Sequence, residues 1–210
     1  MAEIRHVDPD QPEDHHLYHA VDVLRDGGVI IYPTDTIYGI GCNITFKEAI
    51  DRIRQLKDRD ANNPMSFVCS DLDAVSKYAY VSNYAFRILE RFLPGPFTFV
   101  LPPTEETPAF LHSKENGVGI RIPNHPIAQR LATELDSPIL STSANRSQKT
   151  VLTTPEQLKR EFGSQVDLIL ECGELPILPS TVVSLLGDKI TLLREGQGEV
   201  DFFKHQMEAS

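Results

Sequence analysis

Five polar clusters lie at the ends of apolar segments of the chain, and their side chains are of the kinds that bind anions. They are Thr34–Thr36, Lys57 with Arg59, Arg121, Ser141–Asn145, and Ser180 with Thr181. Lysine and arginine bind phosphate, and the planar fork of arginine also matches a carboxylate. Hydroxyl and amide groups suit the base and ribose edges of a nucleotide. If the clusters meet in one place, they would hold a polyanion beside a small polar ligand.

Each cluster taken alone also has a purely structural interpretation. Lys57 and Arg59 follow a predicted helix, where cations complement the negative end of the helix dipole. Arg121 could simply pair with a surface carboxylate. Runs such as Ser141–Asn145 commonly form turns in which side chains bond to nearby backbone. A site is indicated by the whole set, because strand-end loops tend to gather along one edge of a mixed sheet.

Hydrophobic periodicity predicts the elements that would position these clusters. Short strands are expected at 29–32, 37–42, 65–69, 97–101, 117–122, 137–140, 166–170, 181–185 and 189–193. Helices are expected from near Pro12 to Gly27, after a Thr45–Glu48 capping box, from Ser82 to about Phe92, after His125, and after Thr154. Several strands occur in succession near the end, which favours an α/β or α+β fold around a mixed, twisted sheet.

The composition is that of a single globular domain. The chain has 210 residues, of which 40% are hydrophobic and 24% charged. No apolar run has membrane-spanning length, no signal peptide is recognised, and the widely spaced Cys42, Cys69 and Cys172 suit buried thiols in a reducing cytoplasm. The formal net charge of −10 disfavours nucleic acid over most of the surface. A phosphate ligand would therefore need a local group of cations.

Other chemistries have less support. "GIGCNI" lacks the third glycine of a dinucleotide-binding loop, and no GxxxxGK[ST] motif occurs. His15 and His19 are one helical turn apart but have no partner with ligand spacing, so no metal site is predicted. No Ser-His-Asp set with a local signature is present.

The clusters and their neighbours resemble the YrdC-like family, the threonylcarbamoyl-AMP synthases. The matching segments are "PTDTIYGIG", Lys57-x-Arg59 followed by Asn63-Pro64, "LPGPFT", Arg121-x-Pro123, "STSAN", "PSTVV" and "REG" at Arg194. The opening "VDPDQPEDHH", "MSFVCSDL" and "REGQGEV" look closer to the YciO-type branch. The resemblance implies one domain over 1–210, with a core of about 14–200, a short polar N-terminal segment and a C-terminal tail. Its fold would be a twisted mixed β-sheet flanked by helices around a deep cavity.

The resemblance also implies an enzyme that condenses L-threonine, bicarbonate and ATP to threonylcarbamoyl-AMP and pyrophosphate. A threonylcarbamoyl transferase would then pass the product to an adenosine of certain tRNAs. Threonine's amine would take up bicarbonate as a carbamate, which attacks the α-phosphorus. Lys57, Arg59 and Mg²⁺ carried by ATP would offset the repulsion between the two anions, and no general base is assigned.

By motif match, L-threonine is expected to contact Thr34, Arg121, Ser141 and Ser180, with Arg121 holding its carboxylate. ATP is expected to contact Lys57, Arg59, Asn63, Ser143, Asn145 and Arg194. Some positions depart from the family pattern. Val68 stands where the longer synthases carry a histidine, Gly117 replaces a usual threonine, Val151 a usual serine, and Asp60 a proline.

Two other functions would use the same residues. One is an RNA-binding protein of the YciO type, holding double-stranded RNA or tRNA, which the net charge disfavours. The other is a hydrolase that acts on the threonylcarbamoyl group. Forward and reverse chemistry need the same groups in one cavity, so these alternatives remain open from the sequence.

Overall fold

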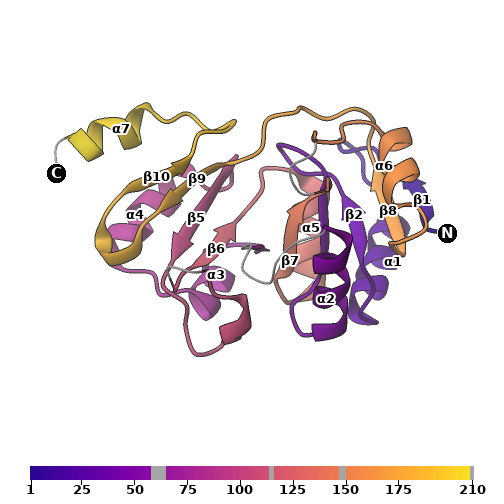
Figure 1. Cartoon of the computed structure of the whole chain (residues 1–210), viewed down its shortest axis with the longest axis horizontal. Helices are drawn as coiled ribbons and strands as arrows, with labels where there is room; N and C mark the ends of the chain where they lie inside the picture. Colours follow the sequence, from indigo (N-terminus) through magenta and orange to yellow (C-terminus); the bar gives the residue numbers. More distant parts are fainter. Residues whose placement is uncertain (58–64, 114–115, 147–149, 209–210) are drawn as a thin grey trace.

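A computed structural model describes residues 1–57, 65–113, 116–146 and 150–208. Its strands form one ten-stranded sheet in the order β1-β8-β2-β3-β7-β4-β6-β5-β9-β10 (Figure 1). The strands are β1 (Glu3–His6), β2 (Ile30–Tyr32), β3 (Gly39–Asn43), β4 (Ser66–Val68), β5 (Phe97–Leu101), β6 (Val118–Arg121), β7 (Ile139–Ser143), β8 (Leu168–Glu171), β9 (Thr181–Ser184) and β10 (Thr191–Arg194). The sheet contains parallel pairs such as β4–β6 and antiparallel pairs such as β3–β7, so the predicted mixed sheet is confirmed.

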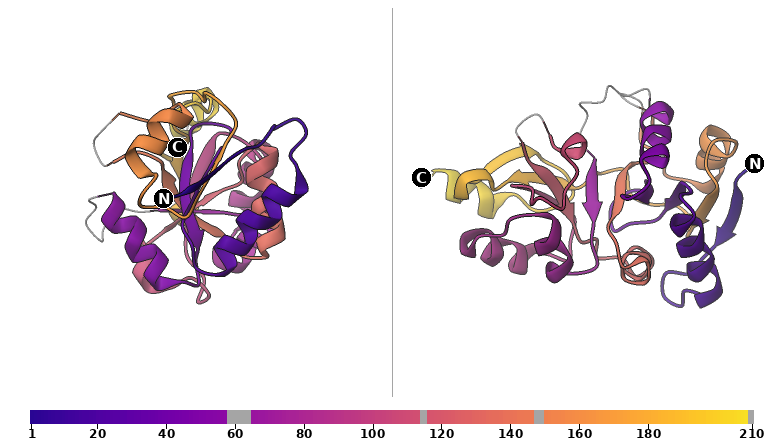
Figure 2. Two further views of the ribbon diagram at one scale, coloured as in Figure 1. Left: turned by 90° about the vertical axis from the view of Figure 1, so that its right-hand side faces the viewer. Right: turned by 90° about the horizontal axis from the view of Figure 1, so that it is seen from below.

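The sheet is strongly twisted, as expected when each strand is rotated relative to the next. Figure 2 shows the strands fanned about the long axis of the molecule, and Figure 1 places the two termini at opposite ends of that axis. The helices are α1 (Asp14–Arg25), α2 (Lys47–Leu56), α3 (Leu72–Tyr78), α4 (Asn83–Phe92), α5 (Pro126–Leu135), α6 (Pro155–Phe162) and α7 (Asp201–Glu208). No helix among the described residues is long and apolar enough to cross a membrane.

Strand alternation divides the core into two hydrophobic clusters. Ile40, Phe67 and Leu140 face the larger cluster, which also takes in buried residues of α2, α4, α6 and α7. Val68 and Ile139 point to the other side and pack with α1 and α5. The small residues Ser66, Gly119 and Ser141 lie beside them on that second side and leave space over the central strands.

Two of the predicted helices begin with a side-chain cap. The Ser82 hydroxyl accepts the Ala85 N–H at the start of α4, and Thr154 forms a capping box with Gln157 at α6. The box predicted from Thr45 and Glu48 was wrong. Asn43 Oδ1 accepts both the backbone N–H and the hydroxyl of Thr45, at 3.1 and 3.0 Å, so α2 begins without a side-chain cap.

One strand and two α-helices were not predicted from the sequence. Strand β1 lies at the sheet edge and pairs in parallel with β8. It is short and polar, as edge strands commonly are, and so lacks the apolar alternation used to find the others. Helix α3 is only seven residues long, with Val75 as its buried residue. Helix α7 packs Phe203 against Phe92 and Phe97, so this segment completes the core.

Candidate functional site

A cavity of about 430 Å³ opens over the central strands on the face that carries the small residues. Six of the residues predicted for the site line it: Thr34, Arg121, Ser141, Ser143, Ser180 and Arg194. They come from the loop after β2 and from the strands β6, β7, β9 and β10 or their ends. Segments that are far apart in the chain therefore meet at one hollow, as the five-cluster hypothesis requires.

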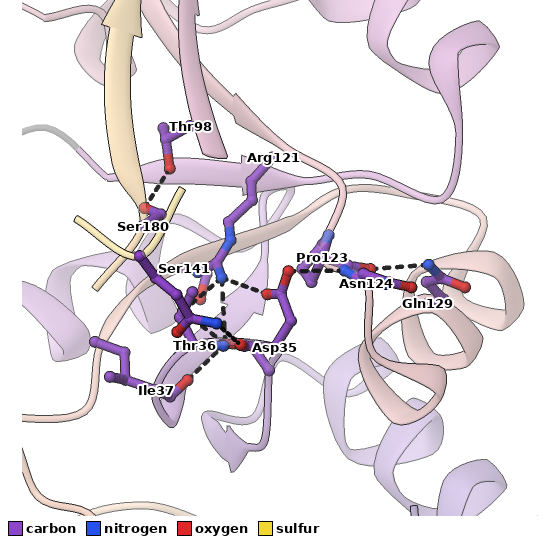
Figure 3. A network of polar contacts seen from close by, with 12 residues as sticks. Asp35, Thr36, Ile37, Thr98, Arg121, Pro123, Asn124, Gln129, Ser141 and Ser180 are labelled. Atoms are coloured by element: carbon purple, nitrogen blue, oxygen red, sulfur yellow. Dashed lines mark hydrogen bonds and ion pairs between the residues drawn. The ribbon is translucent and has the colours of Figure 1, made fainter. Parts of the chain in front are cut away.

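Arg121 leaves the end of β6 and reaches the loop after β2 (Figure 3). Its Nη2 donates to Asp35 Oδ1 at 2.6 Å and to the Thr36 hydroxyl at 2.5 Å, and Asp35 Oδ2 accepts the Asn124 N–H at 2.9 Å. The structural interpretation of Arg121 allowed a pair with a surface carboxylate, but the side chain of Asp35 is only 9% exposed and Asp35 does not itself line the cavity. Arg121 Nε is buried without a hydrogen-bond partner among the described residues. The guanidinium is therefore anchored through one nitrogen and keeps donor capacity.

Arg194 supplies a second cation on the same side of the cavity. Its Nε and Nη2 donate to the Ser180 carbonyl at 3.1 and 2.9 Å, and the Ser180 hydroxyl bonds to that of Thr98 at 2.8 Å. Burial lowers the pKa of Arg194, and the nearby charge of Arg121 lowers it further. Two guanidinium groups that repel each other in a partly buried hollow would be stabilised by an anion between them.

Lys57 lies at the side of the cavity opposite Arg121 and Arg194. It ends α2, is fully buried, and donates from Nζ to the Ser143 carbonyl at 2.6 Å, the Ser143 hydroxyl at 3.3 Å and Asn145 Oδ1 at 2.9 Å. The Ser143 hydroxyl also bonds to Asn145 Oδ1 at 2.5 Å. Ser143 lines the cavity, so this linked group holds an ammonium ion against its wall. Ser143 lies within β7, although a loop was expected there.

Two of the residues predicted to bind the nucleotide are not placed. Arg59 and Asn63, predicted to hold the nucleotide, lie outside the described residues, as does Asp60. Lys57 and Asn145 do not line the cavity themselves and adjoin it through Ser143. Val68, where the family resemblance anticipates a histidine, lines the cavity and pairs with Arg121 across β4 and β6.

Several residues of the site were not assigned from the sequence. Tyr32 donates its phenol O–H to the Ser141 hydroxyl at 2.8 Å, and burial raises the pKa of this phenol to about 12, so it stays neutral. Gln197 Nε2 donates to the Asp35 carbonyl at 2.9 Å, linking the segment after β10 to the loop after β2.

Ser66 and Thr98 line the cavity from inside β4 and β5. Strand alternation places both on the polar face and is the signal that could have found them.

Cys42 and Cys69 behave as core thiols. Burial raises the pKa of Cys42 and of Cys69 to about 12, so neither is activated as a thiolate. Among the described residues there is no group of three or more histidine, cysteine or acidic side chains that could hold a metal ion.

Replacing Asp35 by asparagine tests whether this carboxylate orients Arg121. An amide accepts through one oxygen only, so either Arg121 or the Asn124 N–H would face an NH₂ group. We expect the free energy of unfolding to fall by about 1–3 kcal/mol, with weaker anion binding in the cavity. Asp14, whose exposed pair with Arg130 is 3.0 Å long, is the matched control, and Asp14→Asn should cost under about 1 kcal/mol. Equal effects in urea unfolding would contradict the assigned role.

The fold and the cavity define a mixed-sheet protein with a cation-lined binding site, and comparison with known proteins gives its family. The Sua5/YciO/YrdC family model, described as "Telomere recombination", matches residues 22–196. The chain belongs to this family. It is 38% identical over 205 residues to the uncharacterised protein YciO of Escherichia coli K12, covering 97% of this chain and all of that one. The crystal structure of E. coli YciO superposes with a TM-score of 0.92.

Relatives with named activities are also similar. A threonylcarbamoyl-AMP synthase of Vibrio vulnificus is 32% identical over 163 residues, covering 75% of this chain and 88% of that protein. The crystal structure of P. abyssi Sua5 complexed with L-threonine is 30% identical, with a TM-score of 0.90. This chain is matched over 97% of its length and covers 60% of that protein.

Proposed function

We propose that this protein makes threonylcarbamoyl-AMP and pyrophosphate from L-threonine, bicarbonate and ATP, for the modification of tRNA. The observation that carries the proposal is the convergence on one cavity of Arg121 and Arg194 on one side and the Lys57–Ser143–Asn145 group on the other. Relatives named as threonylcarbamoyl-AMP synthases support it, as does the L-threonine complex of P. abyssi Sua5.

In the proposed arrangement, the carboxylate of threonine accepts hydrogen bonds from Arg121, beside Thr34 and Ser180. The triphosphate lies toward Lys57, Ser143 and Asn145, with Arg59 and Asn63 as further ligands from the sequence prediction. Arg194, which was also predicted to bind ATP, lies on the side of Arg121 instead. Mg²⁺ enters with ATP as part of the substrate. The amine of threonine then points from the first side of the cavity to the second, where the α-phosphorus must lie.

The reaction begins when the threonine amine condenses with bicarbonate, releasing water and giving a carbamate. A carbamate oxygen attacks the α-phosphorus, and the bond to the bridging oxygen breaks as pyrophosphate leaves. Negative charge grows on the phosphoryl oxygens and on the leaving group. Lys57 stabilises this charge from a fixed, buried position, which is worth most where water is excluded. Positioning of the two substrates supplies the rest of the catalysis, so no dedicated base is needed.

The test is pyrophosphate release from purified protein with ATP, Mg²⁺, bicarbonate and L-threonine. Each component is omitted in turn, and the adenylate product is identified by mass spectrometry. Release that requires all four components is the expected result. Pyrophosphate release that is absent, or that does not depend on threonine, would overturn the proposal. Added tRNA should change neither the rate nor its salt dependence, because the acidic surface repels RNA.

A further inference from the structure

The floor of the cavity is a row of small residues from three neighbouring strands. Ser141 of β7 pairs with Ser66 of β4, which pairs with Gly119 of β6. On one side of this row, Ser143 ends β7 beside Lys57. On the other side, Val68 pairs with Arg121. Ser66 therefore lies between the ammonium group and the guanidinium group, at the level where two bound substrates would meet.

The Ser66 hydroxyl differs from the other hydroxyls of the cavity. Most of those are engaged within the protein: Ser141 with Tyr32, Ser180 with Thr98, Ser143 with Asn145, and Thr34 with the Ile37 carbonyl. Ser113 accepts the Gly117 N–H, and Thr142 also has an interaction. The Ser66 hydroxyl has no hydrogen bond among the described residues. A polar group in this position gains a partner only from water or a ligand, and leaving it unpaired under a bound ligand is costly.

The neighbouring strand leaves room for a ligand beside this hydroxyl. A Cβ atom added to Gly119 would lie 3.1 Å from Ser66 Oγ, so the glycine keeps the space next to it open. Ser66 and Arg121 are on adjacent strands and two residues apart in register, which puts their Cα atoms about 8 Å apart. A ligand the size of an amino acid spans this gap with a hydrogen bond at each end.

The three polar substituents of threonine can be assigned to three parts of the cavity. This step rests on the proposed function. The carboxylate goes to Arg121, and the amine must face the α-phosphorus near Lys57. The side chain is left to face the floor, where Ser66 has a hydroxyl that can both donate and accept. We propose that Ser66 recognises the side-chain hydroxyl of the amino acid and thereby selects a hydroxyamino acid over an aliphatic one.

The experiment compares the binding of L-threonine and of L-2-aminobutyrate, which lacks only the hydroxyl group, by isothermal titration calorimetry. The wild type should bind threonine about tenfold more tightly, which is toward the upper end of the range for one neutral hydrogen bond. In Ser66→Ala this ratio should fall to about two or less, with 2-aminobutyrate binding nearly unchanged. Ser66→Thr keeps a hydroxyl at this position and should therefore keep the preference for threonine.

Ser184→Ala is the matched control. Ser184 pairs with Val100, the neighbour of Gly119 in the same row across the sheet, but does not line the cavity. This variant should keep the tenfold preference. Circular dichroism of each variant establishes that it is folded before binding is measured.

The outcomes separate the two proposals. If the wild type binds threonine and Ser66→Ala keeps the full preference for threonine over 2-aminobutyrate, Ser66 does not recognise the side-chain hydroxyl. This inference is then overturned. The same holds if the wild type binds both amino acids equally well. If the wild type binds neither amino acid, the proposed function itself fails.

Discussion

Replacement of Lys57 by methionine is expected to lower the rate of threonine-dependent pyrophosphate release at least a hundredfold. Methionine keeps much of the length of the buried side chain and removes the charge that Nζ brings to Ser143 and Asn145. Loss of one preorganised group that stabilises developing charge commonly costs about 10²–10³ in turnover. The loss should appear mainly in kcat, with threonine affinity nearly unchanged, because threonine is bound on the opposite side of the cavity.

Lys47→Met provides the control for the Lys57 variant. Lys47 begins the same helix, α2, and its ammonium group pairs with Asp51 at the surface, at 2.7 Å. Its removal should leave the rate within about twofold, since an exposed ion pair contributes little. If Lys57→Met is folded and retains more than a tenth of the wild-type rate, Lys57 is not part of the catalytic machinery.

Replacement of Arg121 by lysine is expected to weaken L-threonine binding by roughly tenfold to a hundredfold. Lysine keeps the charge that Asp35 needs at 2.6 Å but loses the planar fork that donates to a carboxylate. A neutral substitution would instead leave Asp35 buried and unpaired, which is strongly destabilising. The conservative change therefore isolates carboxylate recognition from stability.

L-threoninol, which has an alcohol in place of the carboxylate, serves as the control ligand. The wild type and Arg121→Lys should bind it with similar, weak affinity, because the group that Arg121 recognises is absent. Arg130→Lys, at an exposed ion pair with Asp14, should bind threonine as the wild type does. Equal weakening for threonine and threoninol would show that the variant disturbs the cavity in general.

Much of the fold could be predicted from the sequence because its strands are short apolar segments bounded by glycine, proline and hydroxyl residues. Edge strand β1 escaped because none of its four residues is fully buried, so its sequence carries no apolar alternation. The capping box at Thr45 failed because two acceptors competed for local donors, and the nearby Asn43 side chain took the Thr45 N–H and hydroxyl. The spacing of residues along the chain does not show which of two acceptor side chains will lie closer to a backbone N–H in the folded protein.

The candidate site was predicted best where its residues end strands or helices. Lys57, Arg121 and Arg194 are of this kind. Their side chains bond to Ser143, Thr36 and Ser180, respectively, at or beside the cavity. Ser66 and Thr98 were missed because a single hydroxyl inside a strand is common and carries no motif. The bond between Arg121 and Asp35 depends on how the loop after β2 lies over the sheet. That arrangement is a property of the tertiary structure.

The contrast between surface and cavity bears on the choice of ligand. The chain has a formal net charge of −10, while Arg121 and Arg194 both line one hollow and Lys57 adjoins it. An acidic exterior repels a long polyanion such as RNA, whereas a nucleotide bound inside meets the cations at short range. The charge distribution therefore favours small anionic substrates.

The most direct test is a crystal structure of the protein with L-threonine and an ATP analogue whose α,β-bridging oxygen is replaced by a methylene group. The threonine carboxylate should lie at Arg121 and the triphosphate against Lys57, Ser143 and Asn145, with the amine facing the α-phosphorus in the same cavity. Ligands bound at separate places, or a cavity that takes the nucleotide and excludes threonine, would contradict the account.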